Sequence, residues 1–424
     1  MRIAIIHTPF CGRAGGERQV LRLAMALQNI GHEVEIFTSA VYEECYPDFL
    51  KKLTVNIILH PLVRKLPPDL APRIALPTDP QRLLKEVEEL PHLREWMGKT
   101  IGRQYYTSEL PSMLNLGRRI PKGFDIINNH NFPTEWAAFF AKKRLKVPVV
   151  WMCNEPPYWF FVPEFRKGLR KINWPLFEVL DRVTVSYIDE IVVLSRIGAG
   201  YVRKAYNRSA RVVRTGVDTE LFHHASGEDV RKMYGLEGSF VLLYVGRSAH
   251  AQQSSVIRAL YRLSKDYDNV NLILDGSARA QRDRLIRLSE KLGVRDKVLF
   301  LDSHSDEELA RVYAGCDVFV YPSSISPWGL VVTEAMAAAK PVIVSKQAGT
   351  SEIIQSGVNG IVVDHTTAEE IAKQVEMLMN NPKLRKNLGE NAYEYVKNNL
   401  SWEKYAENME SIFQQTISNF KRNL

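Results

Sequence analysis

The fold of this chain can be inferred from residues 321–345, which read YPSSISPWGLVVTEAMAAAKPVIVS. An apolar strand at residues 318–320 leads into this stretch, and a second strand at residues 341–345 ends it. Between the two, Leu330 to Ala339 is rich in alanine and predicts a short buried helix. Strand, helix and strand in this order form a βαβ crossover of a parallel sheet. The helix then begins at the carboxyl end of the sheet, where such sheets bind their ligands.

The start of this helix is suited to binding an anion. The amides of Gly329, Leu330 and Val331 are expected to be first-turn donors without an intrahelical acceptor, aimed at a group such as a diphosphate. A glycine at position 329 lets a ligand approach the backbone closely. Glu334 lies one turn further along an otherwise apolar helix. It is interpreted either as an acceptor for sugar or ribose hydroxyls or as an ordinary, partly exposed helix charge.

This stretch resembles the donor-site signature of family 4 glycosyltransferases, which are retaining nucleotide-sugar enzymes with two facing Rossmann-like domains, the GT-B fold. Trp328–Leu330, Glu334–Ala337 and Pro341-Val342 match the signature. Ser326 stands where the family has its first glutamate, and Ala339 stands where it has a glycine. Ser326 either offers a shorter hydrogen bond to the sugar or only caps the helix. The resemblance implies an α/β protein, similar to the mannosyl-type enzymes that act on glycans and lipid-linked oligosaccharides.

Composition agrees with two soluble globular domains. The chain has 424 residues, of which 45% are hydrophobic and 25% charged, and two domains of about 200 residues each are expected. No apolar run approaches the roughly 20 residues that a membrane-spanning helix needs, and the N-terminal stretch is expected to be a strand rather than a signal peptide. The four cysteines have no CxxC spacing, which favours neither a zinc site nor a disulfide framework and fits a reducing cytoplasm.

The positive charge of the chain is concentrated in one region. The formal net charge is +8, and residues 51–150 contain 17 Lys and Arg against 9 Asp and Glu. No nucleic-acid-binding motif accompanies this excess, so nucleic acid is not an expected partner. An anionic membrane surface, or an acceptor that carries a polyprenyl diphosphate, would meet such a face. A merely solvated basic surface is the alternative.

The N-terminal region predicts a first βαβ unit. Residues 2–6 form a strand, a loop with several glycines follows, and the apolar spacing from Glu17 onward is that of a helix. The loop lacks the GxGxxG pattern of dinucleotide sites. Family members carry a Gly-Gly pair here that borders the transferred sugar and phosphate, and Gly15-Gly16 matches it. A tight turn would need only one of the two glycines.

Three further residues are implicated by the resemblance. His130 follows the strand at residues 125–128, where family members have a histidine near the reacting carbon, although a single histidine at a strand end is more often structural. The family neutralises the leaving phosphate with an arginine and a lysine five positions later. Arg247 is retained, and Gln252 stands at the lysine position. Glutamine brings no charge, and losing one such group costs about 3 kcal/mol, on the order of a hundredfold in rate.

The resemblance assigns catalytic roles to His130, Arg247 and Glu334, and donor-binding roles to Gly15, Gly16, Arg247, Gln252, Ser326, Gly329, Leu330, Val331 and Glu334. The expected domains are an acceptor-side Rossmann-like domain at 1–195 with an insertion at about 61–120, a nucleotide-sugar-binding domain at 196–398, and a helix at 399–424 that crosses back to the first domain. Residues 191–194 are expected to be the last strand of the first domain, and Gly349 is expected to open a helix that runs to Gly357.

The favoured function is that of a retaining glycosyltransferase that moves a sugar from a nucleoside diphosphate to a glycan or lipid-linked acceptor. The enzyme is expected to need no cofactor and no metal, and to work in the cytoplasm or on the cytoplasmic membrane face. The alternative is a catalytically impaired relative that binds nucleotide sugar or glycan without turnover, as the changes at Gln252 and Ser326 allow. A nucleotide-sugar 2-epimerase shares the fold but has no support in residues 321–345.

Overall fold

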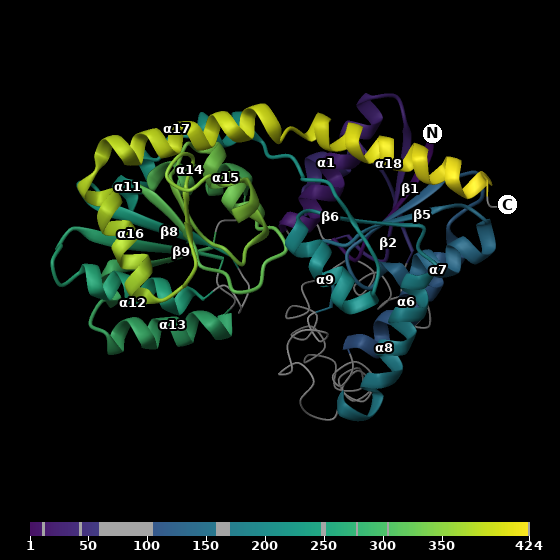
Figure 1. Cartoon of the computed structure of the whole chain (residues 1–424), viewed down its shortest axis with the longest axis horizontal. Helices are drawn as coiled ribbons and strands as arrows, with labels where there is room; N and C mark the ends of the chain where they lie inside the picture. Colours follow the sequence, from purple (N-terminus) through teal and green to yellow (C-terminus); the bar gives the residue numbers. More distant parts are fainter. Residues whose placement is uncertain are drawn as a thin grey trace, which may run out of the picture. The chain divides into compact units, whose positions relative to one another are not determined.

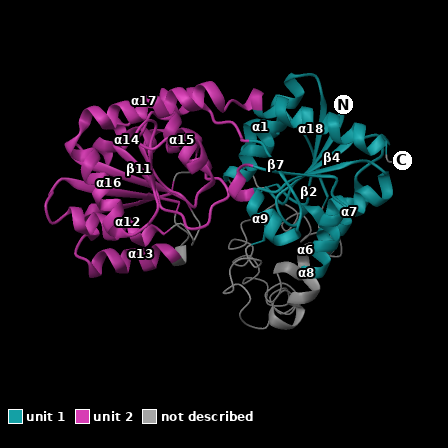
Figure 2. Cartoon of the chain, viewed as in Figure 1, with its two compact units in different colours: residues 1–193, 199–213, 405–424 teal, residues 194–198, 214–404 magenta. Residues whose placement is uncertain are grey.

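The computed structural model describes residues 1–10, 13–41, 45–58, 105–157, 170–246, 252–276, 279–302 and 305–422 (Figure 1). The chain divides into two compact units (Figure 2). Unit 1 comprises residues 1–193, 199–213 and 405–424, and unit 2 comprises residues 194–198 and 214–404. The domain limits proposed from the sequence stay predictions. Of the predicted insertion at 61–120, residues 61–104 lie outside the described residues.

Unit 1 is built on a seven-stranded parallel sheet with the order β3-β2-β1-β4-β5-β6-β7. The strands are β1 (Arg2–Ile6), β2 (Glu33–Thr38), β3 (Thr54–Ile57), β4 (Ile126–His130), β5 (Val149–Met152), β6 (Glu190–Val193) and β7 (Arg211–Val212). The first six follow the Rossmann order. The direction of winding reverses between β1 and β4, and open sheets of this kind bind ligands at the carboxyl ends of the strands that flank the reversal.

Helices cover both faces of this sheet (Figure 1). On one face lie α1 (Gly15–Asn29) and α18 (Trp402–Arg422), and on the other lie α6 (Tyr105–Arg119), α7 (Thr134–Leu145), α8 (Arg170–Ser186) and α9 (Arg196–Tyr206). A short helix, α2 (Pro47–Leu50), precedes β3. Side chains of β1 alternate between the two faces: Ala4 and Ile6 join the core formed with α6, α7 and α9, while Ile3 and Ile5 are buried on the opposite face.

The C-terminal helix packs on unit 1, as the sequence predicts. Tyr405, Met409 and Phe413 recur every four residues along α18 and are fully buried. The Gln19 side-chain amide of α1 donates to the Tyr405 hydroxyl at 2.8 Å. α18 is therefore part of the unit 1 fold.

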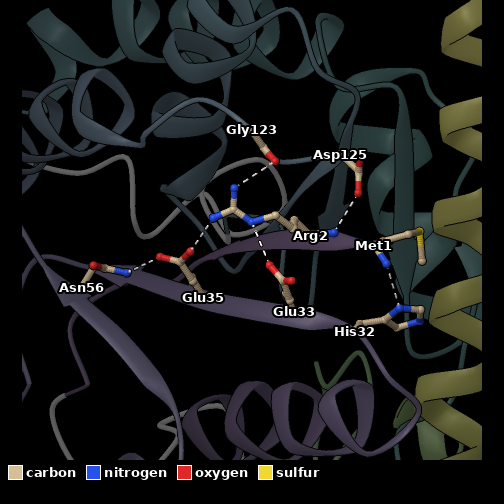
Figure 3. A network of polar contacts seen from close by, with 8 residues as sticks. All are labelled: Met1, Arg2, His32, Glu33, Glu35, Asn56, Gly123 and Asp125. Atoms are coloured by element: carbon tan, nitrogen blue, oxygen red, sulfur yellow. Dashed lines mark hydrogen bonds and ion pairs between the residues drawn. The ribbon is translucent and has the colours of Figure 1, made fainter.

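Arg2 makes several polar contacts with neighbouring segments at the amino edge of this sheet (Figure 3). Its backbone amide donates to Asp125 at 2.7 Å, and its guanidinium contacts Glu33 at 3.0 Å and Glu35 at 3.1 Å. The guanidinium also donates to the Gly123 carbonyl at 3.3 Å. Because the Arg2 side chain is 42% exposed, each pair stabilises the fold by no more than about 1 kcal/mol. The network joins β1 to β2 and to the segment that leads into β4.

Unit 2 repeats the same strand order in a six-stranded parallel sheet, β10-β9-β8-β11-β12-β13. Its strands are β8 (Phe240–Val245), β9 (Val270–Asp275), β10 (Val298–Leu301), β11 (Val318–Tyr321), β12 (Val342–Ser345) and β13 (Ile361–Val363). The reversal lies between β8 and β11. The predicted crossover is confirmed as β11, α15 (Leu330–Ala337) and β12.

The apolar stripes of three helices, α12 (Gln253–Leu263), α13 (Arg279–Lys291) and α16 (Ala368–Asn380), form one core with the strands of unit 2. The other helices are α10 (Thr219–His223), α11 (Glu228–Met233), α14 (Asp306–Gly315), α15 and α17 (Pro382–Asn399), with short 3-10 helices η5 (Arg295–Lys297) and η6 (Gly349–Ile353). The predicted fold class is thus confirmed: two parallel Rossmann-like α/β units, with the C-terminal helix packed on the first.

The strand expected to be the last of the first domain is not the last. Residues 190–193 form β6, and β7 pairs with it and extends the sheet by one more strand. β7 has only two residues, and both are exposed. A strand this short and exposed leaves no apolar pattern in the sequence.

The prediction of a helix from Gly349 to Gly357 is wrong, because only the short helix η6 forms there. The Asn359 side chain binds the backbone just after η6: it accepts from the Gln355 amide at 2.8 Å and donates to the Ile353 carbonyl at 3.2 Å. Gly357 then adopts a φ of +82°, which favours glycine and turns the chain toward β13.

Candidate functional site

The predicted donor-site residues of unit 2 lie at the carboxyl edge of its sheet, next to the β8–β11 reversal. Tyr321 ends β11, and α15 begins nine residues later at Leu330. Gly329 has a φ of +102°, and a Cβ there would lie 3.0 Å from the Tyr321 ring, so the position requires glycine. Among the described residues, the amides of Gly329, Leu330 and Val331 have no backbone acceptor. Together with the helix dipole, they present partial positive charge at this edge.

Ser326 is buried at the same edge and does not cap α15, whose N-cap residue is Gly329. Its hydroxyl lies 3.1 Å from the Tyr321 hydroxyl, and its carbonyl accepts from the Gly349 amide at 2.8 Å. A Cβ at Gly349 would lie 2.0 Å from the Pro327 carbonyl oxygen, so the two backbones approach as closely as glycine allows. The Ser326 side chain is thus already paired inside the protein.

Glu334 is 3% exposed, which contradicts the interpretation as a partly exposed helix charge. The Tyr313 hydroxyl of α14 lies 3.0 Å from Glu334 Oε2 and 3.0 Å from the Val331 carbonyl oxygen. A buried carboxylate needs such a donor, because transfer out of water is otherwise costly. Sequence reasoning missed Tyr313, which has no motif around it and reaches Glu334 only through the packing of α14 on α15.

Of the two residues predicted to bind the leaving phosphate, Arg247 and Gln252, the structure describes only Gln252. Arg247 lies outside the described residues. Gln252 precedes α12 with a φ of +50°, and its Oε1 accepts from the Thr366 hydroxyl. The neighbouring Gln253 donates to the Gly246 carbonyl at 2.8 Å and holds the turn after β8. Gln252 therefore lies at the same edge of the sheet as the start of α15, and its side-chain oxygen already accepts a hydrogen bond from Thr366.

In unit 1, His130 is the last residue of β4 and is fully buried. Its Nε2 lies 2.7 Å from Asn128 Oδ1, while Asn128 Nδ2 donates to the Val150 carbonyl at 3.0 Å. Asn128 Oδ1 is therefore an acceptor, and His130 carries its hydrogen on Nε2. Its Nδ1 is buried without a hydrogen-bond partner among the described residues. Burial, reinforced by nearby His7, holds the pKa of His130 well below its usual value.

The Gly15-Gly16 pair was expected in a loop, but both glycines belong to the first turn of α1. A Cβ at Gly16 would lie 2.9 Å from Asn131 Nδ2, so glycine admits the asparagine that follows His130. Across the β1–β4 reversal, His7 follows β1 and is 1% exposed, and its Nε2 lies 3.3 Å from Asn131 Nδ2. Sequence reasoning missed His7, although its place directly after the first strand was the available signal.

Within the described ranges, no group of three or more His, Cys, Asp or Glu side chains could hold a metal ion. The expectation of a metal-independent reaction stays a prediction. In the same part of the chain, no helix is both long and apolar enough to cross a membrane.

Two family profiles match the chain. Residues 13–221 match Glycosyltransferase Family 4, and residues 227–395 match Glycosyl transferases group 1. Together they cover most of both units.

Individual relatives agree with this. The D-inositol 3-phosphate glycosyltransferase of Mycolicibacterium smegmatis is 26% identical over 382 residues, which are 86% of this chain and 80% of that protein. Spore coat protein SA of Bacillus subtilis is 23% identical over 64% of this chain and 80% of its own length.

Solved structures share the fold at lower identity. The Anabaena protein HepE in complex with UDP and glucose has a TM-score of 0.71 at 17% identity, over 97% of this chain and 99% of that one. Sucrose-phosphate synthase from Thermosynechococcus elongatus has a TM-score of 0.70 at 20% identity, over 99% of both chains. The signature around α15, the two Rossmann-like sheets and these matches agree: the chain belongs to glycosyltransferase family 4 and has the GT-B fold.

Proposed function

We propose that the protein is a retaining glycosyltransferase that moves a sugar from a nucleoside diphosphate to a hydroxyl of a glycan or lipid-linked acceptor. The observation that carries this proposal is the start of α15. Three backbone amides lie there at the carboxyl edge of a Rossmann-like sheet, with no backbone acceptor among the described residues, and buried Glu334 lies one turn behind them. The amides suit a diphosphate, and the carboxylate suits hydroxyls of the sugar or ribose. HepE, which shares the fold, was solved with UDP-glucose bound.

In the proposed reaction, the bond between the anomeric carbon and the β-phosphate oxygen breaks. The acceptor oxygen attacks the same face of the sugar, and its proton passes to the leaving phosphate. Negative charge develops on that phosphate, and Arg247 would stabilise it with a bidentate guanidinium contact. Gln252 would add a hydrogen bond without charge. The acceptor is proposed to carry phosphate, in keeping with the basic segment 51–150 and with the name of the D-inositol 3-phosphate glycosyltransferase relative.

A second candidate function has its own observation. The Gln252 and Ser326 side chains, which replace charged residues of the family signature, pair with Thr366 and Tyr321 inside the protein. A protein that binds nucleotide sugar without turnover would show the same arrangement.

The decisive experiment is a thermal-shift screen of UDP-, GDP- and ADP-sugars, followed by a turnover assay with every sugar that binds. A donor at a hundred times its Kd stabilises the folded state by about 2.7 kcal/mol. Binding with transfer or hydrolysis, and an unchanged anomeric configuration in the product, supports the enzyme. Binding without turnover supports the second candidate. No shift with any nucleotide sugar would overturn both.

Variants locate the donor site. Arg247→Ala is expected to abolish the donor-induced shift, whereas Gln252→Lys is expected to keep or raise donor affinity by restoring the charge of the family. Arg284→Ala, which removes an exposed arginine of α13 in the same unit, is the matched control. Equal donor affinity in the wild type and in Arg247→Ala would rule out this assignment.

A further inference from the structure

Five polar side chains form a continuous hydrogen-bonded series in unit 1, which we call the amide line. It runs from Tyr405 of α18 through Gln19 of α1 to Asn154, Asn131 and His7, which follow β5, β4 and β1. Gln19 Nε2 lies 2.8 Å from the Tyr405 hydroxyl, and Asn154 Nδ2 lies 2.5 Å from Gln19 Oε1. Asn154 Nδ2 also lies 2.8 Å from Asn131 Oδ1, and Asn131 Nδ2 lies 3.3 Å from His7 Nε2.

The tautomer of His7 shows the direction of the donors along the amide line. Its Nδ1 lies 2.7 Å from the Thr8 carbonyl oxygen, which can only accept, so Nδ1 carries a hydrogen. Burial lowers the pKa of His7 to about 4, against the opposing effect of the hydrogen bond to the Thr8 carbonyl, so the ring is neutral near pH 7. Nε2 is then an acceptor. The side chain of Asn131 must therefore point its NH₂ group at His7.

Each remaining orientation follows from the one before it. Asn131 Oδ1 accepts one hydrogen of the Asn154 NH₂ group, and Gln19 Oε1 accepts the other. Gln19 then donates to the Tyr405 hydroxyl. Because both hydrogens of the Asn154 amide are used, Asn154 is the one member that donates in two directions along the line.

The amide line adjoins His130, the residue directly before Asn131. His130 is buried and uncharged, with its hydrogen on Nε2 and an Nδ1 that has no hydrogen-bond partner in the described part of the chain. A neutral imidazole therefore lies at the carboxyl end of each strand that flanks the reversal: His7 directly after β1, and His130 at the end of β4.

We propose that Asn154 is a positioning residue: through Asn131 it holds His7 as the neutral Nδ1–H tautomer and so keeps positive charge away from the carboxyl edge of unit 1. This matters for sugar transfer because the sugar becomes positively charged in an oxocarbenium-like transition state, and a nearby cation would oppose that charge. The link to sugar transfer rests on the proposed function; the tautomer of His7 does not.

The substitution Asn154→Asp is expected to reverse the direction of the hydrogen bonds between position 154 and His7. A carboxylate there can only accept, so Asn131 would turn its NH₂ group toward position 154 and its Oδ1 toward His7 Nε2. His7 would then face an acceptor at each ring nitrogen and would satisfy both only as the imidazolium. Gln19→Glu is expected to leave the direction of the donors unchanged, because a carboxylate at position 19 accepts from both the Tyr405 hydroxyl and the Asn154 amide.

The test compares the wild type, Asn154→Asp and the matched variant Gln19→Glu by side-chain NMR of ¹⁵N-histidine-labelled protein without substrate. The ¹⁵N shifts distinguish the two tautomers and the imidazolium, and His7→Gln assigns the His7 signals. We expect neutral Nδ1–H His7 at pH 7 in the wild type and in Gln19→Glu, and imidazolium in Asn154→Asp. A charged or Nε2–H His7 in the wild type would overturn the proposal, even if a variant failed to fold. So would an unchanged His7 in folded Asn154→Asp.

A kinetic arm then tests the link to sugar transfer. With a donor found in the screen, Asn154→Asp is expected to lower kcat on the order of tenfold and to leave the donor KM within about threefold. Thr416→Val, which alters a buried hydroxyl of α18 outside the amide line, is expected to match the wild type. An unchanged kcat in Asn154→Asp with a charged His7 would overturn the electrostatic role. The expected tautomers with no turnover of any sugar would instead count against the proposed function alone.

Discussion

At the scale of single residues, Glu334 is the side chain on which the proposed donor site most depends. The carboxylate is buried and receives a hydrogen bond from Tyr313, so its position is set before any ligand arrives. A preorganised acceptor binds hydroxyls without first losing rotamer freedom. Hydrogen bonds accepted by an ionised carboxylate are stronger than those accepted by a neutral amide oxygen.

Glu334→Gln is therefore expected to weaken donor binding by about 1.5–3 kcal/mol, roughly 10- to 100-fold in Kd, since hydrogen bonds to charged groups are worth this much. Titration calorimetry with the best donor of the screen measures the effect. Glu394→Gln, at an exposed position of α17, is the matched control and should leave Kd unchanged. Equal Kd values for Glu334→Gln and the wild type would exclude Glu334 from the donor site.

A buried pair of carboxyl groups lies in unit 1 and was not predicted. Glu135 of α7 and Asp181 of α8 are fully buried, and the Tyr206 hydroxyl donates to Asp181 Oδ2 at 2.8 Å. Burial raises the pKa of Asp181 to about 6. Burial, with the Asp181 charge added, also raises the pKa of Glu135 well above its usual value. Folding therefore takes up protons at this pair, since unfolded Asp and Glu titrate near about 4.

The sign of the pH dependence follows from linkage. A raised carboxyl pKa contributes stability that is fully present below about pH 4 and, for Asp181, is lost as the pH rises through about 6. Asp181→Asn removes that titration and can still accept from Tyr206. The melting temperature of this variant relative to the wild type is expected to rise by a few degrees between pH 5 and pH 7. Asp48→Asn, an exposed change, should show no such trend. A constant difference across this range would refute the argument.

At the scale of elements, α18 shows how a terminal segment becomes part of a domain core. Its buried residues share one face at helical spacing, and that face meets the sheet side occupied by α1. His32, before β2, lies 3.2 Å from Glu410 of α18. The amide line adds Tyr405, so packing and polar contacts both join this helix to unit 1.

Phe413→Ala is expected to lower the free energy of unfolding of unit 1 by about 3–5 kcal/mol, because a fully buried ring is replaced by a cavity. Gln414→Ala, at the exposed neighbouring position, should change it by less than about 0.5 kcal/mol. Urea unfolding monitored by circular dichroism measures both. A loss below about 1 kcal/mol for Phe413→Ala would mean that α18 is not packed as the structure shows.

At the scale of the whole molecule, charge is the property that points beyond the chain. The net charge is +8, and the excess of 17 basic over 9 acidic residues lies in residues 51–150. Residues 59–104 of this segment lie outside the described residues, so the charges of that part are known from sequence alone. None of the described helices is long and apolar enough to cross a bilayer. The basic excess makes surface attraction the form of membrane contact to test.

Weak binding to anionic liposomes is expected, and it should fall as salt rises, because exposed charges are screened beyond about 8 Å at physiological ionic strength. Co-sedimentation with phosphatidylserine-containing vesicles at low and high salt measures it, with neutral vesicles as the control. Identical sedimentation with neutral and anionic vesicles at low salt would leave a soluble acceptor as the favoured interpretation of the basic segment.

The sequence by itself determined the local elements and the family. Helical and strand periods follow from backbone geometry, so the crossover of β11, α15 and β12 could be recognised from its pattern of apolar residues. Gly329 and Glu334 could be placed at the start of α15 because the signature around them is contiguous. The same reasoning failed for β7 and η6, which are too short to show a period.

Only the tertiary structure decided which side chains meet. Tyr313 reaches Glu334 from a different helix, Gln19 reaches Tyr405 across 386 residues, and Glu135 meets Asp181 across two helices. Such pairs depend on strand order and on how each helix packs against the sheet, and no local pattern encodes either. The tautomers of His7 and His130 belong to the same class. They are set by neighbours that the fold supplies, since an isolated imidazole has no preference strong enough to choose.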